Sequence, residues 1–246
     1  MNSNLKTQLR TVAVMQPYIF PYLGYFQLIA RSDAFIFYDD VSFIKGGWIN
    51  SNKVLASSGG VQSFSVSLEG GQSSSRSISD TPLSTRREWQ GKFIRSLRET
   101  YARAPHIEKV SALVNEVLTT PSSSIADLAC LSIRAVCGYV GLTPHFERSS
   151  RFSPETFNQG RTERLITMTH RLEGRRYLNL DGGRAFYEPT SFEASGIELR
   201  FLTPRLDTYM QGNRSNFIPS LSVIDTLMWN RPEVVYEMAQ QGNVAP

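Results

Sequence analysis

Cysteine and histidine are scarce in this sequence, with two cysteines and three histidines among 246 residues. Cys130 and Cys137 fall in one apolar helical pattern, and neither a C-x-x-C motif nor a Cys/His ligand spacing is present. His106, His145 and His170 have no ligand spacing to one another, and no serine or cysteine nucleophile motif accompanies them. We therefore expect reduced core thiols, histidines with structural or surface roles, and no metal site.

Several familiar signatures are missing as well. The sequence contains no Walker loop, no G-x-G-x-x-G after its first expected strand and no G-x-S-x-G. It has no run of about 18 apolar residues, and no apolar segment follows the positive charges near its start. The formal net charge is +4, and the one dense group of Lys and Arg, at 86–103, suits a solvated helix face better than a nucleic-acid site. These absences predict a soluble, cytoplasmic protein without a membrane span.

The clearest structural pattern lies in residues 11–52. TVAVM and FIFY are short apolar runs, and each predicts a strand buried on both faces. Pro17 and Pro21 between them delay a helix until Tyr22, after which the chain can form about three turns. This order of elements predicts a right-handed crossover with parallel strands. The carboxyl ends of such strands open onto a common crevice, where ligands of open α/β sheets bind.

The alternation of strands and helices occurs again later in the chain. GRTERLITMTHRLEG predicts an amphipathic helix that leads into the strand RYLNL, and ELRFL predicts a further strand. Residues 41–71 alternate apolar and polar positions around glycine pairs, which suits short strands or hairpins. A last helix is expected at 222–229. We predict one α/β domain over 1–246, Rossmann-like, with a mostly parallel sheet, flanking helices and a mainly helical insertion at about 85–140.

Polar side chains at the expected strand ends supply the candidate catalytic residues. Gln16 follows the first strand, and Asp39 and Asp40 follow the second. Adjacent strand residues point to opposite faces, so at most one of the two aspartates faces the crevice. Tyrosine hydroxyls in the loop and helix between the strands need partners if they are buried. We predict that Asp40, Tyr25 and Gln16 are catalytic.

A wider group of residues is predicted to bind substrate. Asn179 ends the strand RYLNL, where its amide could orient a polar ligand, and Lys45 could meet a phosphate or carboxylate. Structural roles stay open for these residues, including Asx turns at the asparagines and a solvated position for Lys45. The predicted substrate-binding residues are Tyr18, Tyr22, Gly24, Asp39, Lys45, Asn50, Asn52, Asn179, Gly182, Gly183, Tyr209 and Gln211.

The opening unit resembles that of the HIGH-motif nucleotidyltransferases and pantothenate synthetases. The resemblance lies in a strand, a loop with prolines and aromatics, YLGY at the start of a helix, and a second strand. Those families have histidines at the positions of Tyr22 and Tyr25. The imidazoles that stabilise the phosphate during adenylyl transfer are therefore missing here. This resemblance implies a Rossmann-like topology only.

A second resemblance covers nearly the whole chain. MQPYIFPYLGYFQLIARSDAFIFYDDVSF, WINSN, TYARAPH, YLNLDGG, the EL-x-FL strand with Tyr209 and Gln211 after it, and FIPSLSVIDTLMWN together resemble the WbqC-like family. Ser51 stands where that family commonly has arginine, so no anion contact is carried over to this position. Members of the family are often found in bacterial O-antigen or other surface-glycan gene clusters, and some carry a glycine-transferase label.

The resemblance implies a transferase of surface-glycan or related small-molecule biosynthesis. Its reaction would be the acylation, with glycine as one candidate group, of an amino group on an aminosugar-type substrate such as a nucleotide-linked aminosugar. Tyr and Asn donors, with an aspartate to accept the amine proton, would serve this transfer without a histidine. Two other classes stay open: a non-catalytic ligand-binding or scaffold protein of a biosynthetic cluster, and a divergent nucleotidyltransferase-like enzyme. The sequence names no cofactor and no acyl donor; a tRNA, an ATP-activated amino acid and a thioester stay open, and no other nucleic-acid partner is expected.

Overall fold

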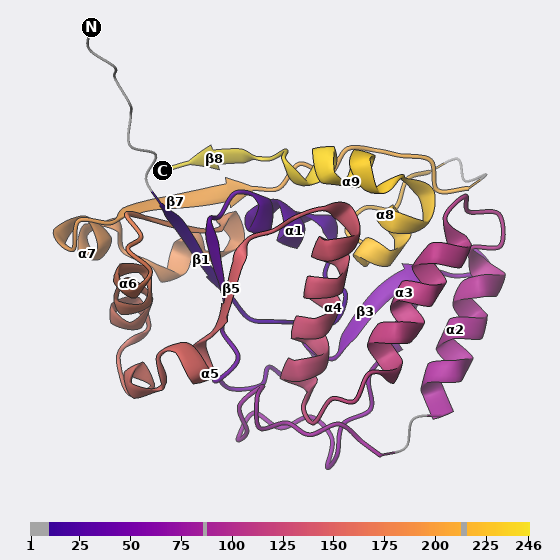
Figure 1. The fold of residues 1–246 in the computed structure, drawn as a ribbon, viewed down its shortest axis with the longest axis horizontal. Helices are drawn as coiled ribbons and strands as arrows, with labels where there is room; N and C mark the ends of the chain where they lie inside the picture. Colours follow the sequence, from indigo (N-terminus) through magenta and orange to yellow (C-terminus); the bar gives the residue numbers. More distant parts are fainter. Residues whose placement is uncertain (1–9, 86–87, 213–215) are drawn as a thin grey trace, which may run out of the picture.

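The computed structural model describes residues 10–85, 88–212 and 216–246. Its centre is a six-stranded sheet in the order β5-β2-β1-β6-β7-β8, in which β8 is antiparallel to β7 and the other pairs are parallel (Figure 1). The fold is therefore α/β and Rossmann-like, with a mostly parallel sheet and flanking helices, as the sequence predicted. The strands of this sheet are β1 (Thr11–Met15), β2 (Ala34–Phe37), β5 (His145–Arg148), β6 (Arg176–Leu180), β7 (Glu198–Thr203) and β8 (Asn243–Ala245).

The remaining elements are an antiparallel hairpin, the α-helices and two short 3-10 helices. The hairpin consists of β3 (Ser51–Leu55) and β4 (Val61–Ser65). The helices are α1 (Leu23–Ala30), α2 (Glu88–Thr100), α3 (Ile107–Thr119), α4 (Ile125–Val140), α5 (Ser149–Phe152), η1 (Pro154–Thr156), α6 (Arg161–Arg171), η2 (Asp181–Phe186), α7 (Pro189–Ala194), α8 (Val223–Trp229) and α9 (Pro232–Ala239).

The strands β1 and β2 and the helix α1 form the crossover predicted from residues 11–40. On one side β1 pairs with β2, where Val12 faces Ala34, and on the other it pairs with β6, where Val12 faces Tyr177. Strands β2 and β5 therefore lie on one side of β1, whereas β6 and β7 lie on its other side. This reversal makes β1 the topological switch point of the sheet, and a ligand crevice is expected outside the carboxyl ends of the strands there.

Helices cover the two faces of the sheet unequally (Figure 1). On one face, Val12 and Val14 pack with Leu165 of α6 and Phe192 of α7. On the other side lie α1, α3, α4, α8 and α9, whose apolar residues form the larger core. Because successive strand residues point to opposite faces, Gln16 continues the row of Val12 and Val14 on the α6 side.

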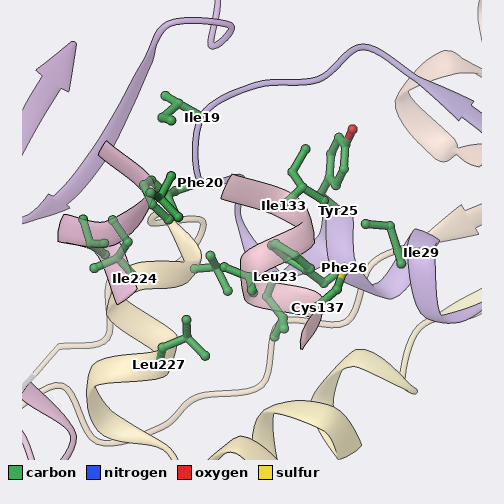
Figure 2. Packing of buried hydrophobic residues seen from close by; sticks show 14 of the residues in the cluster. Ile19, Phe20, Leu23, Tyr25, Phe26, Ile29, Ile133, Cys137, Ile224 and Leu227 are labelled. Carbon is green, nitrogen blue, oxygen red and sulfur yellow. The ribbon is translucent and has the colours of Figure 1, made fainter. Parts of the chain in front are cut away.

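The larger core forms around the loop and helix that follow β1. Figure 2 shows Phe20 and Phe26 packed among side chains of α4 and α8. Phe20 has a φ of 42°, a left-handed conformation that is uncommon for a residue with a Cβ. Its N–H donates to Ser132 Oγ at 3.0 Å, and its carbonyl accepts from Asn52 Nδ2 at 2.6 Å. These bonds hold the loop that begins at Gln16.

The carboxyl-terminal part differs from the prediction of one last helix. After α8 the chain forms a second helix, α9, and a short edge strand, β8. Pro232 takes the first helical position of α9, where its missing N–H has no helical partner to lose. The strand β8 has three residues and is mostly exposed, so no apolar pattern marks it.

Three helices, α2, α3 and α4, stand between β4 and β5, at the place of the predicted helical insertion. Positions 86 and 87 of that segment lie outside the described residues. The last of the three, α4, begins with a capping box of Ser124 and Asp127 and ends at Gly141, which has a φ of 87°. The division into one domain with an insertion stays a prediction.

Candidate functional site

A cleft of about 900 Å³ opens at the carboxyl ends of β1, β2 and β5. It lies outside the carboxyl ends of parallel strands, where open α/β sheets bind ligands, and Gln16 after the switch-point strand β1 is among its lining residues. One wall comes from the segments at 41–44 and 75–80, and the other from the segment at 150–161. The lining residues are Gln16, Tyr38, Asp40, Val41, Ser42, Ile44, Ser75, Arg76, Ser77, Asp80, Ser150, Pro154, Phe157, Gln159, Arg161 and Arg164.

Asp40 is the carboxylate that two neighbouring elements hold in this cleft. Arg164 Nη2 of α6 donates to its Oδ2 at 2.5 Å, and the Ser149 hydroxyl of α5 lies 2.6 Å from its Oδ1. The Asp40 side chain keeps 11% of its surface exposed, against 3% for Arg164. A carboxylate has about four acceptor positions, so Asp40 can still accept a hydrogen bond or a proton from a bound ligand.

Asp39 points to the other face of the sheet and does not line the cleft. Its side chain is fully buried, and Oδ2 accepts from Arg148 Nε at 2.7 Å. Arg148 also pairs with Asp127 at the start of α4. Partial burial opposes ionisation of Asp127, but hydrogen bonds from Ser123 and Arg148 lower its pKa to about 2. Only one of the two adjacent aspartates therefore reaches the cleft, as the alternation of strand residues predicted.

Gln16 and Tyr25 meet, although only Gln16 lines the cleft. The Tyr25 hydroxyl donates to the backbone carbonyl of Gln16 at 3.1 Å. Tyr25 is fully buried, and Figure 2 shows its ring in the apolar core near Ile133. Burial raises the pKa of the Tyr25 hydroxyl well above its ordinary value. The amide side chain of Gln16 has no hydrogen-bond partner in the described part of the chain, so it is available to a ligand.

The other residues of the first aromatic loop pack against one another. The rings of Tyr18 and Tyr25 meet edge to face at 5.2 Å. The ring of Tyr22 covers Gly24 so closely that a Cβ at position 24 would lie 2.5 Å from it. Burial raises the pKa of the Tyr18 and Tyr22 hydroxyls. Gly24 is thus needed for the close approach of the Tyr22 ring, and none of Tyr18, Tyr22 and Gly24 lines the cleft.

Asn50 and Asn52 connect the β3–β4 hairpin to its surroundings. Asn50 Nδ2 donates to the carbonyl of Val66 at 2.9 Å, and Asn52 Nδ2 donates to the carbonyl of Ile19 at 3.1 Å. Both asparagines are buried. Lys45 is exposed and is not among the lining residues, although it follows Ile44, which lines the cleft.

Asn179 lies on the same face of the sheet as Gln16 but does not line the cleft. Its Nδ2 donates to Tyr177 Oη at 3.2 Å, and its Oδ1 accepts from the next backbone N–H at 2.7 Å. Gly182 and Gly183 belong to η2, the turn after β6. A Cβ at position 183 would lie 3.2 Å from the amide nitrogen of Asn179. These contacts are typical of a tight turn at the end of a strand.

Tyr209 and Gln211 surround a buried aspartate, Asp225 of α8, away from the cleft. Its carboxylate accepts from the hydroxyls of Tyr101 at 2.9 Å and Tyr209 at 2.6 Å, and from Gln211 Nε2 at 2.8 Å. Burial, followed by the charge of Asp225, raises the pKa of both tyrosine hydroxyls. The network connects the segment after β7 to α8 and to Tyr101, the residue that follows α2.

Sequence reasoning missed the arginines of the cleft. Arg164 belongs to the buried stripe of α6, with Leu165 and Met168. Its guanidinium carbon lies 5.0 Å from the ring centre of Tyr38, and burial opposes its charge while the hydrogen bond to Asp40 raises its pKa. An arginine on the apolar stripe of a predicted helix was the signal that could have found it, because a buried arginine requires an acidic partner.

Within the described ranges, no group of three or more His, Cys, Asp or Glu is placed to hold a metal ion. No helix in the same ranges combines the length and the apolar character that a membrane span needs.

Similarity to known proteins indicates the family of this chain. The chain is 25% identical over 222 residues to "Uncharacterized protein Rv1507c" of Mycobacterium tuberculosis, an alignment that covers 89% of this chain and 93% of the relative. No solved structure matches the chain. The family model of the WbqC-like protein family matches residues 16–237, which include Gln16, Asp40 and Arg164. The chain therefore belongs to the WbqC-like protein family.

Proposed function

We propose that the protein is a transferase that acylates an amino group of an aminosugar-type substrate bound in the cleft, with glycine as the candidate acyl group. The observation that carries the proposal is the Asp40 carboxylate, which Arg164 and Ser149 fix in a large cleft that also presents the Gln16 amide. A substrate amine and hydroxyl groups would find acceptors and donors there, including four serine hydroxyls.

The transfer would use these groups in a simple order. The amine nitrogen attacks the acyl carbonyl carbon, and the nitrogen becomes acidic as the N–C bond forms. Asp40 accepts that proton as general base, the bond between the carbonyl carbon and the donor's leaving group breaks, and the leaving group departs with the bonding electrons. The free N–H bonds of the Gln16 amide are suited to stabilising the negative charge on the carbonyl oxygen.

The histidines do not offer an alternative base in the cleft. His106 precedes α3, the His145 ring pairs with Glu147, and the His170 ring meets the carbonyl of Ser195. None of the three is among the lining residues. This distribution supports a carboxylate, rather than an imidazole, as the proton acceptor.

A transfer assay tests the proposal. The protein is incubated with a set of nucleotide-linked aminosugars and, separately, with glycyl-tRNA, glycine plus ATP, or a glycyl thioester, and products are identified by mass spectrometry. An N-glycylated product is expected with one of these donors, and none with the matched N-acetylated sugar, whose amine is blocked. If the aminosugar binds but no donor gives an acylated product, the protein binds its ligand without this chemistry.

A further inference from the structure

Two arginines in the cleft have no carboxylate partner in the described part of the chain. Arg161, the first residue of α6, lies with its guanidinium carbon 5.3 Å from the ring centre of Phe186. Arg76 donates to the backbone carbonyls of Glu69 at 3.0 Å and Gly71 at 2.7 Å. Arg164 differs from both because Asp40 neutralises it. The two remaining guanidinium groups are therefore available to an anion.

The balance of charge in the lining agrees with an anionic ligand. The lining contains three arginines and two aspartates, so its formal charge is positive. The second aspartate, Asp80, accepts from the Ser77 hydroxyl at 2.6 Å. The positive charge comes from both walls, because Arg76 belongs to one and Arg161 to the other. Arginine is suited to phosphate groups, since its planar guanidinium presents several N–H donors in a fixed geometry.

Large apolar side chains are exposed in and beside the same cleft. Phe157 is 60% exposed and Ile44 is 50% exposed, and both line it. Phe186, which is 62% exposed, lies beside Arg161. Exposed aromatic rings next to arginines are an arrangement that the planar base of a nucleotide can use for stacking.

We propose that the cleft binds a nucleoside diphosphate group, with the diphosphate on Arg161 and Arg76 and the base on the ring of Phe157. The cleft volume of about 900 Å³ is sufficient for such a ligand. This inference rests on the proposed function in one respect, because the sugar amine of the same ligand would then lie at Asp40.

Isothermal titration calorimetry on the full chain tests the subsite with inorganic pyrophosphate and with UDP, dTDP, GDP and CDP, each with and without magnesium. Pyrophosphate and at least one nucleoside diphosphate are expected to bind. Arg161→Gln is expected to weaken both kinds of ligand by about tenfold or more, because it removes a charge from the diphosphate site. Phe157→Ala is expected to weaken the nucleoside diphosphate by about tenfold and to leave pyrophosphate unchanged.

Arg231→Gln is the matched control, since Arg231 is exposed and precedes α9, away from the cleft. It should bind every ligand as the parent does. The proposal is overturned if the parent binds neither pyrophosphate nor any nucleoside diphosphate, or if Arg161→Gln binds like the parent. Equal weakening of pyrophosphate by Phe157→Ala would overturn the placement of the base.

The same titrations separate this inference from the proposed function. Binding of a free aminosugar without binding of any diphosphate would overturn the nucleotide subsite and leave acyl transfer at Asp40 intact. Diphosphate binding together with an absence of amine acylation would support the subsite and contradict the transferase.

Discussion

Replacement of Arg148 by methionine is expected to lower the free energy of unfolding by about 3–5 kcal/mol. Arg148 pairs with Asp39, whose side chain is fully buried, and its own side chain is 13% exposed. Removing the guanidinium leaves the Asp39 carboxylate uncompensated in the interior, although the backbone N–H and the hydroxyl of Ser150 still donate to it. The loss is a large fraction of the total stability of a typical domain, about 5–15 kcal/mol.

Urea unfolding followed by circular dichroism measures this effect. Arg151→Met is the matched control because Arg151 lies on the same short helix, α5, and is exposed. Its free energy of unfolding should stay within about 0.5 kcal/mol of the parent. A loss below about 1 kcal/mol for Arg148→Met would show that the pair with Asp39 is not a main connection between β2 and β5.

Substitution of Asp40 by asparagine is expected to lower the rate of acyl transfer by about 100-fold or more, the usual range for loss of a general base. Asparagine has nearly the same shape and can still accept from Arg164, but it cannot take the proton of the amine. Some stability should be lost as well, because Arg164 is almost fully buried and loses its negative partner. Rates are therefore compared at a temperature where circular dichroism shows each variant to be folded.

Asp39→Asn is the control that separates chemistry from stability. Asp39 is adjacent in sequence, is buried and belongs to an ion pair, but it does not line the cleft. Its asparagine variant should lose stability and keep a transfer rate within about threefold of the parent. If it does not fold, Asp127→Asn, which breaks the other ion pair of Arg148, takes its place. Equal loss of rate in Asp40→Asn and the control would assign both aspartates a structural role.

The sheet could be predicted from sequence because its central strands are buried on both faces. TVAVM and RYLNL correspond to β1 and β6 residue for residue, and the period of two along a strand correctly indicated that at most one of Asp39 and Asp40 faces the cleft, without showing which. The cap of α4 also follows from local chemistry, since Ser124 and Asp127 satisfy each other's backbone groups. Strand periodicity and helix capping could be predicted because each depends on residues that are close together in the sequence.

The candidate site was only partly accessible to such rules. Gln16 and Asp40 line the cleft, but Arg164 lies 124 positions from Asp40, and no local pattern indicates that they pair. Polar residues near strand ends proved to have partners of their own, as Tyr209 and Gln211 do at Asp225. A sequence shows that a buried polar group needs a partner. It does not show whether that partner is another side chain or a ligand.

If the ligand binds at the carboxyl ends of β1 and β2, hydrogen–deuterium exchange of the full chain will locate it there. Exchange is measured by mass spectrometry with and without a saturating nucleotide-linked aminosugar. The cleft assignment predicts slower exchange at 38–44, 75–80 and 157–164, the segments that contribute its walls and Asp40. Slower exchange confined to 206–226, around Tyr209 and Asp225, with no change in those three segments, would contradict it.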